Sequence, residues 1–219
     1  MKDLKLTSDE IRGAHPAPEP KRRGNRTTRV PEILEVAISV FATEGYVGFT
    51  QRRIANDAGI RLRTLQHYFG TREELLRSAI QELARRYIAE YRELAKDNAR
   101  SPDERLERLV DQVFDLLTGP ERYAGAFALH CWSLAEHEPF VNELMAKNQS
   151  ELIDMFSGLI AKLNPSLPSG ECTLRAELIV SHLHGLVVFI RRRGDNETDW
   201  DALRVATKAV WKALSRAPQ

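Results

Sequence analysis

The segment from Thr28 to Arg72 limits the fold most, because three helical stretches follow one another there with very short connections. Gly45 ends the first stretch, Thr50 can cap the second, and Gly59 supplies the left-handed residue that stops it. A third short helix is predicted from about Leu62 to Phe69. Two helices joined by a turn of three to four residues that contains Gly are typical of the helix-turn-helix motif. The apolar stripe of the first helix consists of Ile33, Leu34, Ala37, Val40 and Phe41.

The rest of the chain also has helical spacing. Capping boxes at Thr71–Glu74 and Ser101–Glu104 begin two helices. No alternation of apolar and polar residues indicates a strand, so we predict an all-α chain of about nine helices. Residues 1–26, 27–72 and 73–219 form the predicted arm, head and body. The predicted body helices span about 71–96, 101–119, 121–137, 139–163, 171–193 and 199–215.

The charge of the chain is unevenly distributed. The net charge is only +1, but residues 21–72 contain ten basic and four acidic residues, so this part carries about +6 and the remainder about −5. Such asymmetry favours contact of one end with a polyanion, although a solvated surface gives the same pattern. Residues 1–26 are rich in Pro and end in Lys-Arg-Arg-Gly, which predicts a disordered basic arm. The arm either follows DNA or is a passive tail.

The third helix of the head has the composition of a helix that enters the major groove. Leu65 and Phe69 are spaced to hold it to its scaffold, which leaves polar residues on the other side. We expect Arg63 and Gln66 to read bases, because Arg pairs with guanine and Gln with adenine. A packing unit with no DNA contact remains the alternative. The second helix begins with Thr50, Gln51 and Arg52, which are placed to hold phosphates.

Several other classes of protein lack support in the sequence. We find no GxSxG elbow, phosphate loop, HExxH or calcium loop, so we expect no enzyme, catalytic residue or cofactor. Cys131 and Cys172 have no CxxC spacing, and the histidine pairs His130/His137 and His182/His184 lack a third ligand, so we expect no metal site. The longest apolar run, Leu186 to Ile190, is too short for a membrane span. A soluble protein of the reducing cytosol fits these features.

The residues of the head closely resemble the N-terminal domain of the TetR family of transcriptional regulators. The resemblance covers roughly 50 residues and includes Ile33-Leu34-x-x-Ala37-x-x-x-Phe41-x-x-x-Gly45-Tyr46, Thr50-x-x-x-Ile54-Ala55-x-x-Ala58-Gly59-Ile60 and Thr64-Leu65-x-x-Tyr68-Phe69-x-x-Arg72-Glu73-Glu74-Leu75-Leu76. It implies a homodimeric bacterial repressor of the cytoplasm and nucleoid that binds a palindrome-like operator on double-stranded DNA. A small hydrophobic or aromatic effector, bound by the body, is expected to release it. A helical interaction module and an activator without an effector remain alternatives.

The resemblance also transfers the family's DNA-facing positions to this chain, with three departures. Arg61 stands where the family often has a capping Ser, Leu62 where a polar residue is common, and Gln66 where a Tyr usually contacts the backbone. The operator sequence therefore cannot be taken from relatives. The predicted DNA-binding residues are Thr50, Gln51, Arg52, Arg61, Leu62, Arg63, Thr64, Gln66, His67, Tyr68 and Arg72.

In the body, the resemblance implies a dimer interface on the last two helices and an effector pocket among the middle ones. For each set of residues, ordinary monomer core is the alternative. The predicted interface consists of Leu178, His182, Gly185, Leu186 and Phe189 on one helix and Leu203, Thr207, Val210 and Leu214 on the other. The predicted pocket residues are Tyr87, Tyr91, Phe114, Phe127, Cys131, Trp132, Leu134, Met155 and Phe156.

Overall fold

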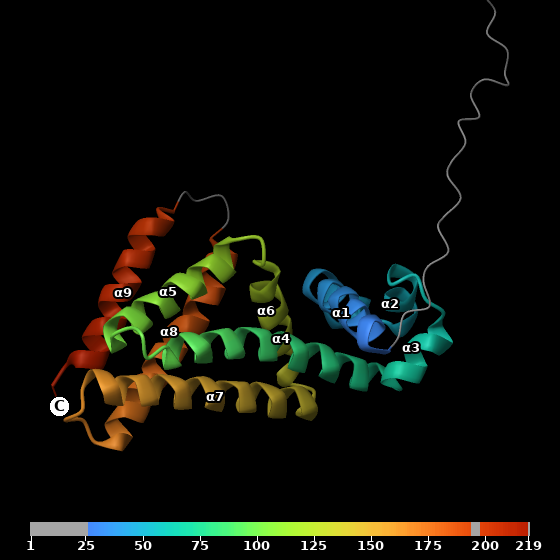
Figure 1. The fold of residues 1–219 in the computed structure, drawn as a ribbon. Helices are drawn as coiled ribbons and strands as arrows, with labels where there is room; N and C mark the ends of the chain where they lie inside the picture. Colours follow the sequence, from blue (N-terminus) through green and yellow to red (C-terminus); the bar gives the residue numbers. More distant parts are fainter. Residues whose placement is uncertain (1–25, 194–197, 219) are drawn as a thin grey trace, which may run out of the picture.

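The computed structural model describes residues 26–193 and 198–218, and these residues form nine helices (Figure 1). The predicted arm therefore lies outside the described residues, apart from Arg26. The all-α prediction is confirmed, and most helix ends fall within two or three residues of the predicted ones. The helices are α1 Arg26–Gly48, α2 Gln51–Asp57, α3 Leu62–Phe69, α4 Arg72–Lys96, α5 Pro102–Thr118, α6 Tyr123–Ala135, α7 Pro139–Leu163, α8 Ser169–Arg192 and α9 Trp200–Arg216.

Local capping explains where these helices begin. The Thr50 hydroxyl accepts the backbone N–H of Arg53 at 3.2 Å, and Thr71 and Ser101 each form a complete capping box. Gly45 interrupts α1 as predicted, since its backbone is non-helical, with φ at 65°, and only a short helical segment follows this kink to Gly48. A Cβ at Gly45 would lie 3.0 Å from the ring of His130.

Two cores hold the molecule together, and α4 runs from one to the other (Figure 1). The head core centres on Phe41 and includes residues of α1 to α4, with contributions from α6 and α7. The body core surrounds Phe114, Phe156 and Trp211. Since α6 contributes Phe127 and Cys131 to the head core, this body helix packs directly against the head.

A row of ion pairs fixes α9 against α5. Acidic residues four apart on α5 face basic residues four apart on α9, which defines one antiparallel register. The pairs are Asp103 with Arg216, Glu107 with Lys212 at 2.7 Å, Asp111 with Lys208 at 2.7 Å and Asp115 with Arg204 at 2.8 Å.

The structure corrects the predicted interface stripe of α9. Thr207 is 2% exposed, and Leu203 and Leu214 pack against the body core, so three of the four predicted residues face inward. Only Val210 faces solvent, with 46% of its surface exposed. The reason is that α9 has apolar or small residues on two faces, and the stripe chosen from spacing is the one that the monomer buries.

Helix α8 also has apolar residues on two faces. Among the described residues it is the one helix long and apolar enough to cross a membrane, with a mean hydropathy of 1.4. Its inner face, which includes Leu186, packs in the body core. Leu178 and Phe189 are 46% and 53% exposed, as predicted for an interface, and no heavy atom lies within 4 Å of a Cβ built on Gly185. His182, by contrast, is half-buried and bonded to α9.

Candidate nucleic-acid interface and buried cavity

Helix α3 is anchored by a thin apolar seam. Leu65 is fully buried and Phe69 nearly so, as the spacing predicts. Arg63, Gln66 and His67 are exposed on the opposite side. The other three predicted residues of α3, Leu62, Thr64 and Tyr68, are half-buried. Leu62 and Tyr68 also pack against the head core. The helix therefore presents a short polar face on a fixed scaffold.

The arginines at the tip of the head differ in their partners. The guanidinium groups of Arg52, Arg61 and Arg63 are exposed and have no hydrogen bond or ion pair among the described residues. Arg53 differs, because it pairs with Asp57 at 2.7 Å and with Glu44 at 2.8 Å, and these carboxylates raise its pKa. The three unpaired cations keep all their donors for phosphates or bases.

Two glutamines form a chain of hydrogen bonds across this surface. Gln51 Nε2 donates to the carbonyl oxygen of Gly70 at 2.8 Å, and Gln66 Nε2 donates to Gln51 Oε1 at 3.4 Å. Gln51 thus orients the amide of Gln66, whose Oε1 accepts no hydrogen bond among the described residues. Sequence reasoning assigned Gln51 to phosphates and missed this positioning contact, which joins residues 15 apart.

Arg72 is held inside the head. Its Nε donates to the Phe49 carbonyl at 2.6 Å, its Nη2 donates to the Tyr46 carbonyl, and the guanidinium lies 3.8 Å above the Tyr46 ring. The group is half-buried and joins the start of α4 to the connection between α1 and α2. The structure therefore gives Arg72 a scaffold role that supports the position of Thr50, and its DNA contact stays a prediction.

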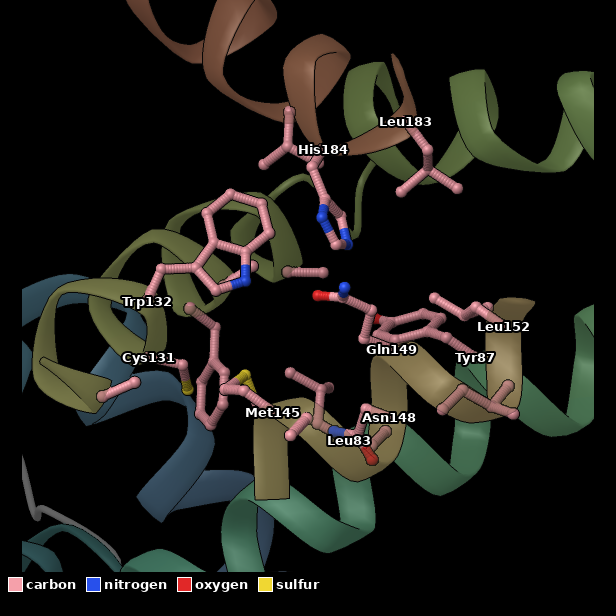
Figure 2. Close-up of a pocket in the computed structure, with 18 of the residues that line it drawn as sticks. Leu83, Tyr87, Cys131, Trp132, Met145, Asn148, Gln149, Leu152, Leu183 and His184 are labelled. Atoms are coloured by element: carbon pink, nitrogen blue, oxygen red, sulfur yellow. The ribbon is translucent and has the colours of Figure 1, made fainter. Parts of the chain in front are cut away.

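A cavity of about 970 Å³ lies between α4, α5, α6, α7 and α8 (Figure 2). Of the predicted pocket residues, Tyr87, Tyr91, Phe127, Cys131 and Trp132 line it. In Figure 2, Tyr87, Trp132, Gln149 and His184 point into the same space from four different helices. The lining residues that the prediction missed include Leu83, Met145, Asn148, Gln149, Leu152 and His184.

Four predicted pocket residues do not line the cavity. Phe114 and Phe156 are fully buried in the body core, where the Phe156 ring meets Trp211 edge-on at 5.3 Å. Met155 packs beside them, and Leu134 packs against the head core. Spacing alone did not separate the two sets, because both consist of residues that face inward and only the packing between helices decides which of them border the cavity.

Burial controls the ionisation of the polar groups at the cavity. It raises the pKa of the Cys131 thiol, which is therefore not a reactive thiolate. Burial also raises the pKa of Tyr87, whose hydroxyl donates to Glu121 at 3.2 Å. Burial lowers the pKa of His184, whose ring centre lies 4.9 Å from that of Trp132, so His184 is neutral at pH 7. No cluster of three potential metal ligands occurs among the described residues.

One wall of the cavity is shared with the head. The ring of Phe127 lines the cavity and lies 4.8 Å from that of Phe41, centre to centre. The Phe41 ring in turn meets Phe49 edge-on at 5.6 Å, and Phe49 immediately precedes Thr50, the cap of α2. A continuous row of aromatic rings thus joins the cavity to the N-terminus of α2.

The anchored polar helix, the unpaired arginines and the capped α2 define a helix-turn-helix DNA-binding protein. Sequence-family comparison is consistent with this class and narrows it. The family model "Bacterial regulatory proteins, tetR family" matches residues 33–79, and the model "BetI-type transcriptional repressor, C-terminal" matches residues 102–214. The second match covers more than half of the chain. The chain belongs to the TetR family, with a BetI-type C-terminal domain, and is a DNA-binding transcriptional regulator.

Individual relatives agree with this assignment. The transcriptional regulator BetI of Stenotrophomonas maltophilia is 27% identical over 75% of this chain and 82% of its own length. BetI of Paraburkholderia phymatum is 26% identical over 89% of this chain and 97% of its own length. A putative regulator from Saccharomonospora viridis, solved in complex with choline, has a TM-score of 0.70 and 18% identity, and the match covers 84% of this chain and 95% of that one. At 18% identity, this last comparison shows a similar fold and nothing further.

Proposed function

We propose that the chain is a homodimeric repressor that leaves its operator when a small molecule occupies the cavity between α4 and α8. The observation that carries the proposal is the position of Phe127, which lines the cavity and packs against Phe41 of the head. A ligand that displaces this ring changes the support of α1 and, through Phe49, of α2. Binding of a ligand in the cavity then changes the free energy of DNA binding. Such coupling is what a repressor released by an effector requires.

The dimer in this proposal forms through the outer faces of α8 and α9. These faces carry exposed large apolar side chains, which single soluble chains rarely gather on neighbouring helices. Because TetR-family regulators dimerise and bind operators, a second copy is the natural occupant. The exposed residues are Leu174, Leu178, Val188 and Phe189 on α8 and Val205 and Val210 on α9.

The effector in this proposal is a small organic molecule with apolar or aromatic parts, and no cofactor is required. The volume of about 970 Å³ lies at the upper end of the range for drug-sized ligands. The choline bound to the Saccharomonospora viridis regulator supports a small-molecule ligand for this fold. The predicted site of action is the nucleoid in the bacterial cytoplasm.

Selection of operators from a random pool of DNA duplexes tests the DNA-binding half of the proposal. We expect enrichment of a palindrome-like site, because two copies of α3 read two half-sites. Screening small molecules for release of that duplex tests the effector half. If the selection recovers unrelated sequences without symmetry, the protein is not a dimeric regulator of the proposed kind. If compounds bind the cavity and none of them releases the DNA, the effector mechanism is wrong.

A further inference from the structure

A ring of three hydrogen bonds connects the start of α2 with the end of α3. Gln51 Nε2 donates to the carbonyl oxygen of Gly70 at 2.8 Å, and Gln66 Nε2 donates to Gln51 Oε1 at 3.4 Å. The backbone N–H of Gly70 in turn donates to the carbonyl oxygen of Gln66 at 2.8 Å. The side chain of Gln66, which is exposed on the polar face of α3, is therefore attached both to α2 and to the end of its own helix.

The backbone carbonyl in this ring determines the orientation of both amides. A carbonyl oxygen only accepts, so Gln51 must turn its NH2 group toward Gly70 and its Oε1 toward Gln66. Gln66 must then offer its own NH2 group to Gln51. A Gln amide has nearly the same shape after a half-turn, and only its hydrogen bonds separate the two orientations. Turning either amide would place two acceptors against each other.

The position of the Gly70 carbonyl is itself fixed. The φ of Gly70 is 62°, in the left-handed region that favours glycine, and a Cβ there would collide with the carboxylate of Glu74. That carboxylate accepts the backbone N–H of Thr71 at 2.7 Å in the capping box of α4. The acceptor for Gln51 thus belongs to a connection that the cap of α4 holds in place.

Gln66 keeps one donor and one acceptor for DNA. Of the two N–H groups on Nε2, Gln51 uses one, and Oε1 accepts no hydrogen bond among the described residues. In the major groove, adenine offers the complementary pair, an acceptor at N7 and a donor at N6. Guanine offers two acceptors, N7 and O6, which suit a free Gln that can turn both of its N–H groups toward them. The oriented amide therefore favours adenine over guanine.

We infer that Gln51 is a positioning residue for sequence choice: it fixes the amide of Gln66 before DNA binds, and Gln66 then selects adenine at one base pair of each half-site. The inference deepens the DNA-binding part of the proposed function and rests on it, but it requires no effector. Gln51 lies on α2 and needs no base contact of its own. The rival role for Gln51 is a direct contact with phosphate, which carries no preference among bases.

Operator selection with the original chain and with Gln66→Ala locates the base pair in question. The pair that loses its preference in Gln66→Ala is expected to be A·T in the operator of the original chain. Affinities for duplexes that differ only at this pair should show a roughly tenfold preference for adenine over guanine, as for one bidentate contact. Another preferred base at this pair overturns the inference.

Gln51→Met tests the positioning role, because it keeps the length of the side chain but has no amide. The preference for adenine over guanine should fall to about threefold or less, since the freed Gln66 can serve guanine as well. Gln51→Ala, with the best helix former at this residue, should give the same result, so the outcome does not depend on how Met packs. A retained preference in either variant overturns the inference. The control Asn56→Ala removes another exposed amide from α2 and should keep the full preference.

A double-mutant cycle separates positioning from phosphate contact. On the A·T operator, Gln51→Met should weaken binding several-fold in the original chain but hardly at all in the Gln66→Ala background. The slope of log K against log salt should stay unchanged. Equal losses in both backgrounds, or a shallower slope, assign Gln51 to phosphate and overturn the inference. Selection of no common sequence contradicts the proposed function and the inference together, whereas a symmetric operator without adenine at this pair overturns the inference alone.

Discussion

The guanidinium groups at the tip of the head are of two kinds, those paired within the chain and those left for a ligand. Arg53 pairs with two carboxylates and Arg72 with two backbone carbonyls. Arg52, Arg61 and Arg63 have no such partner among the described residues. The hydrogen-bond donors of a paired guanidinium group are already occupied. The three unpaired arginines should therefore account for most of the electrostatic attraction to DNA.

Arg52→Ala is expected to weaken binding to all duplexes, since Arg52 lies in the first turn of α2, where we expect it to contact phosphate and not base edges. The slope of log K against log salt should become shallower by roughly one unit, the effect of one lost phosphate contact. Titrations at several salt concentrations measure it. The control is Arg53→Ala, whose charge is already neutralised by Asp57 and Glu44, and it should change the slope less. If both variants change the salt dependence equally, the distinction between paired and unpaired arginines is wrong.

Arg63→Ala should relax sequence choice at one base pair of each half-site. The expected cost is about 1–3 kcal/mol on the preferred base and little on the others, because a bidentate contact to guanine is lost. Arg61 lies one residue before α3 and has no side-chain cap contact, so Arg61→Ala should cost the same on every sequence. Measuring affinity on duplexes with single base changes distinguishes them. A uniform loss for Arg63→Ala would show that it holds only the backbone.

At the scale of elements, α6 is the helix that connects the cavity to the head. Phe127 lines the cavity, Cys131 lies one turn further along, and both belong to the head core. His130 of the same helix covers Gly45, where α1 bends. A shift of α6 therefore acts on α1 directly, in addition to any shift carried by α4.

Phe127→Leu should weaken the coupling between cavity and head while leaving both sites intact. Because the proposed coupling is reciprocal, we expect operator binding to alter the cavity, and 5-fluorotryptophan at Trp132 can report this change by fluorine NMR. The selected operator is expected to shift this resonance in the original chain and to shift it by less than half as much in Phe127→Leu. Phe156→Leu, in the body core, is the matched control and should keep the full shift. An undiminished shift in Phe127→Leu would contradict the aromatic route.

The sequence predicted the positions of the helices better than it predicted which face of each helix is buried. The Thr50 cap begins α2, Gly59 follows its end and Gly70 follows the end of α3, and these local signals do not depend on the rest of the fold. The inner face of α9 is different, because Thr207 and Val210 lie on the same helix and only packing against α5 and α8 decides which is buried. Likewise, Phe114 and Tyr91 are both buried aromatics, yet only Tyr91 borders the cavity. Contacts between distant helices decide both cases.

The contact between α8 and α9 should weaken in acid. His182 Nδ1 accepts the Trp211 Nε1–H at 2.8 Å, and burial lowers the pKa of His182 below its usual value of about 6.5. A base whose pKa is lower in the folded state stabilises the fold above about pH 6.5, and this contribution is lost as the pH falls from there to the folded pKa. Thermal unfolding between about pH 7.5 and pH 5 measures the loss.

His182→Gln provides the control for this acid sensitivity. The Gln carbonyl can accept the Trp211 N–H but takes up no proton in this range, so the variant should lose less stability on acidification than the original chain. An identical pH profile in both proteins would mean that another group, such as His184, causes the loss.

At the scale of the whole molecule, the exposed faces of α8 and α9 determine, in the proposed dimer, how two heads are presented to DNA. Leu178, Phe189 and Val210 are large apolar residues with about half of their surface in water. The acidic residues of α5 and the basic residues of α9 already pair with each other, so they need no partner from a second copy. Two copies that bury these faces against each other would hold the two copies of α3 at a fixed spacing.

Val210→Asp is expected to yield folded monomers that bind the operator poorly. The side chain is 46% exposed in the single chain, so the substitution should leave helicity and monomer stability nearly unchanged. In a dimer, each copy would bury one unpaired carboxylate, at a cost on the order of 3 kcal/mol. Sedimentation velocity at micromolar concentration measures the assembly. Val47→Asp, at an equally apolar and 91% exposed residue of the head, should remain dimeric. A stable Val210→Asp dimer would exclude this face of α9 from the interface.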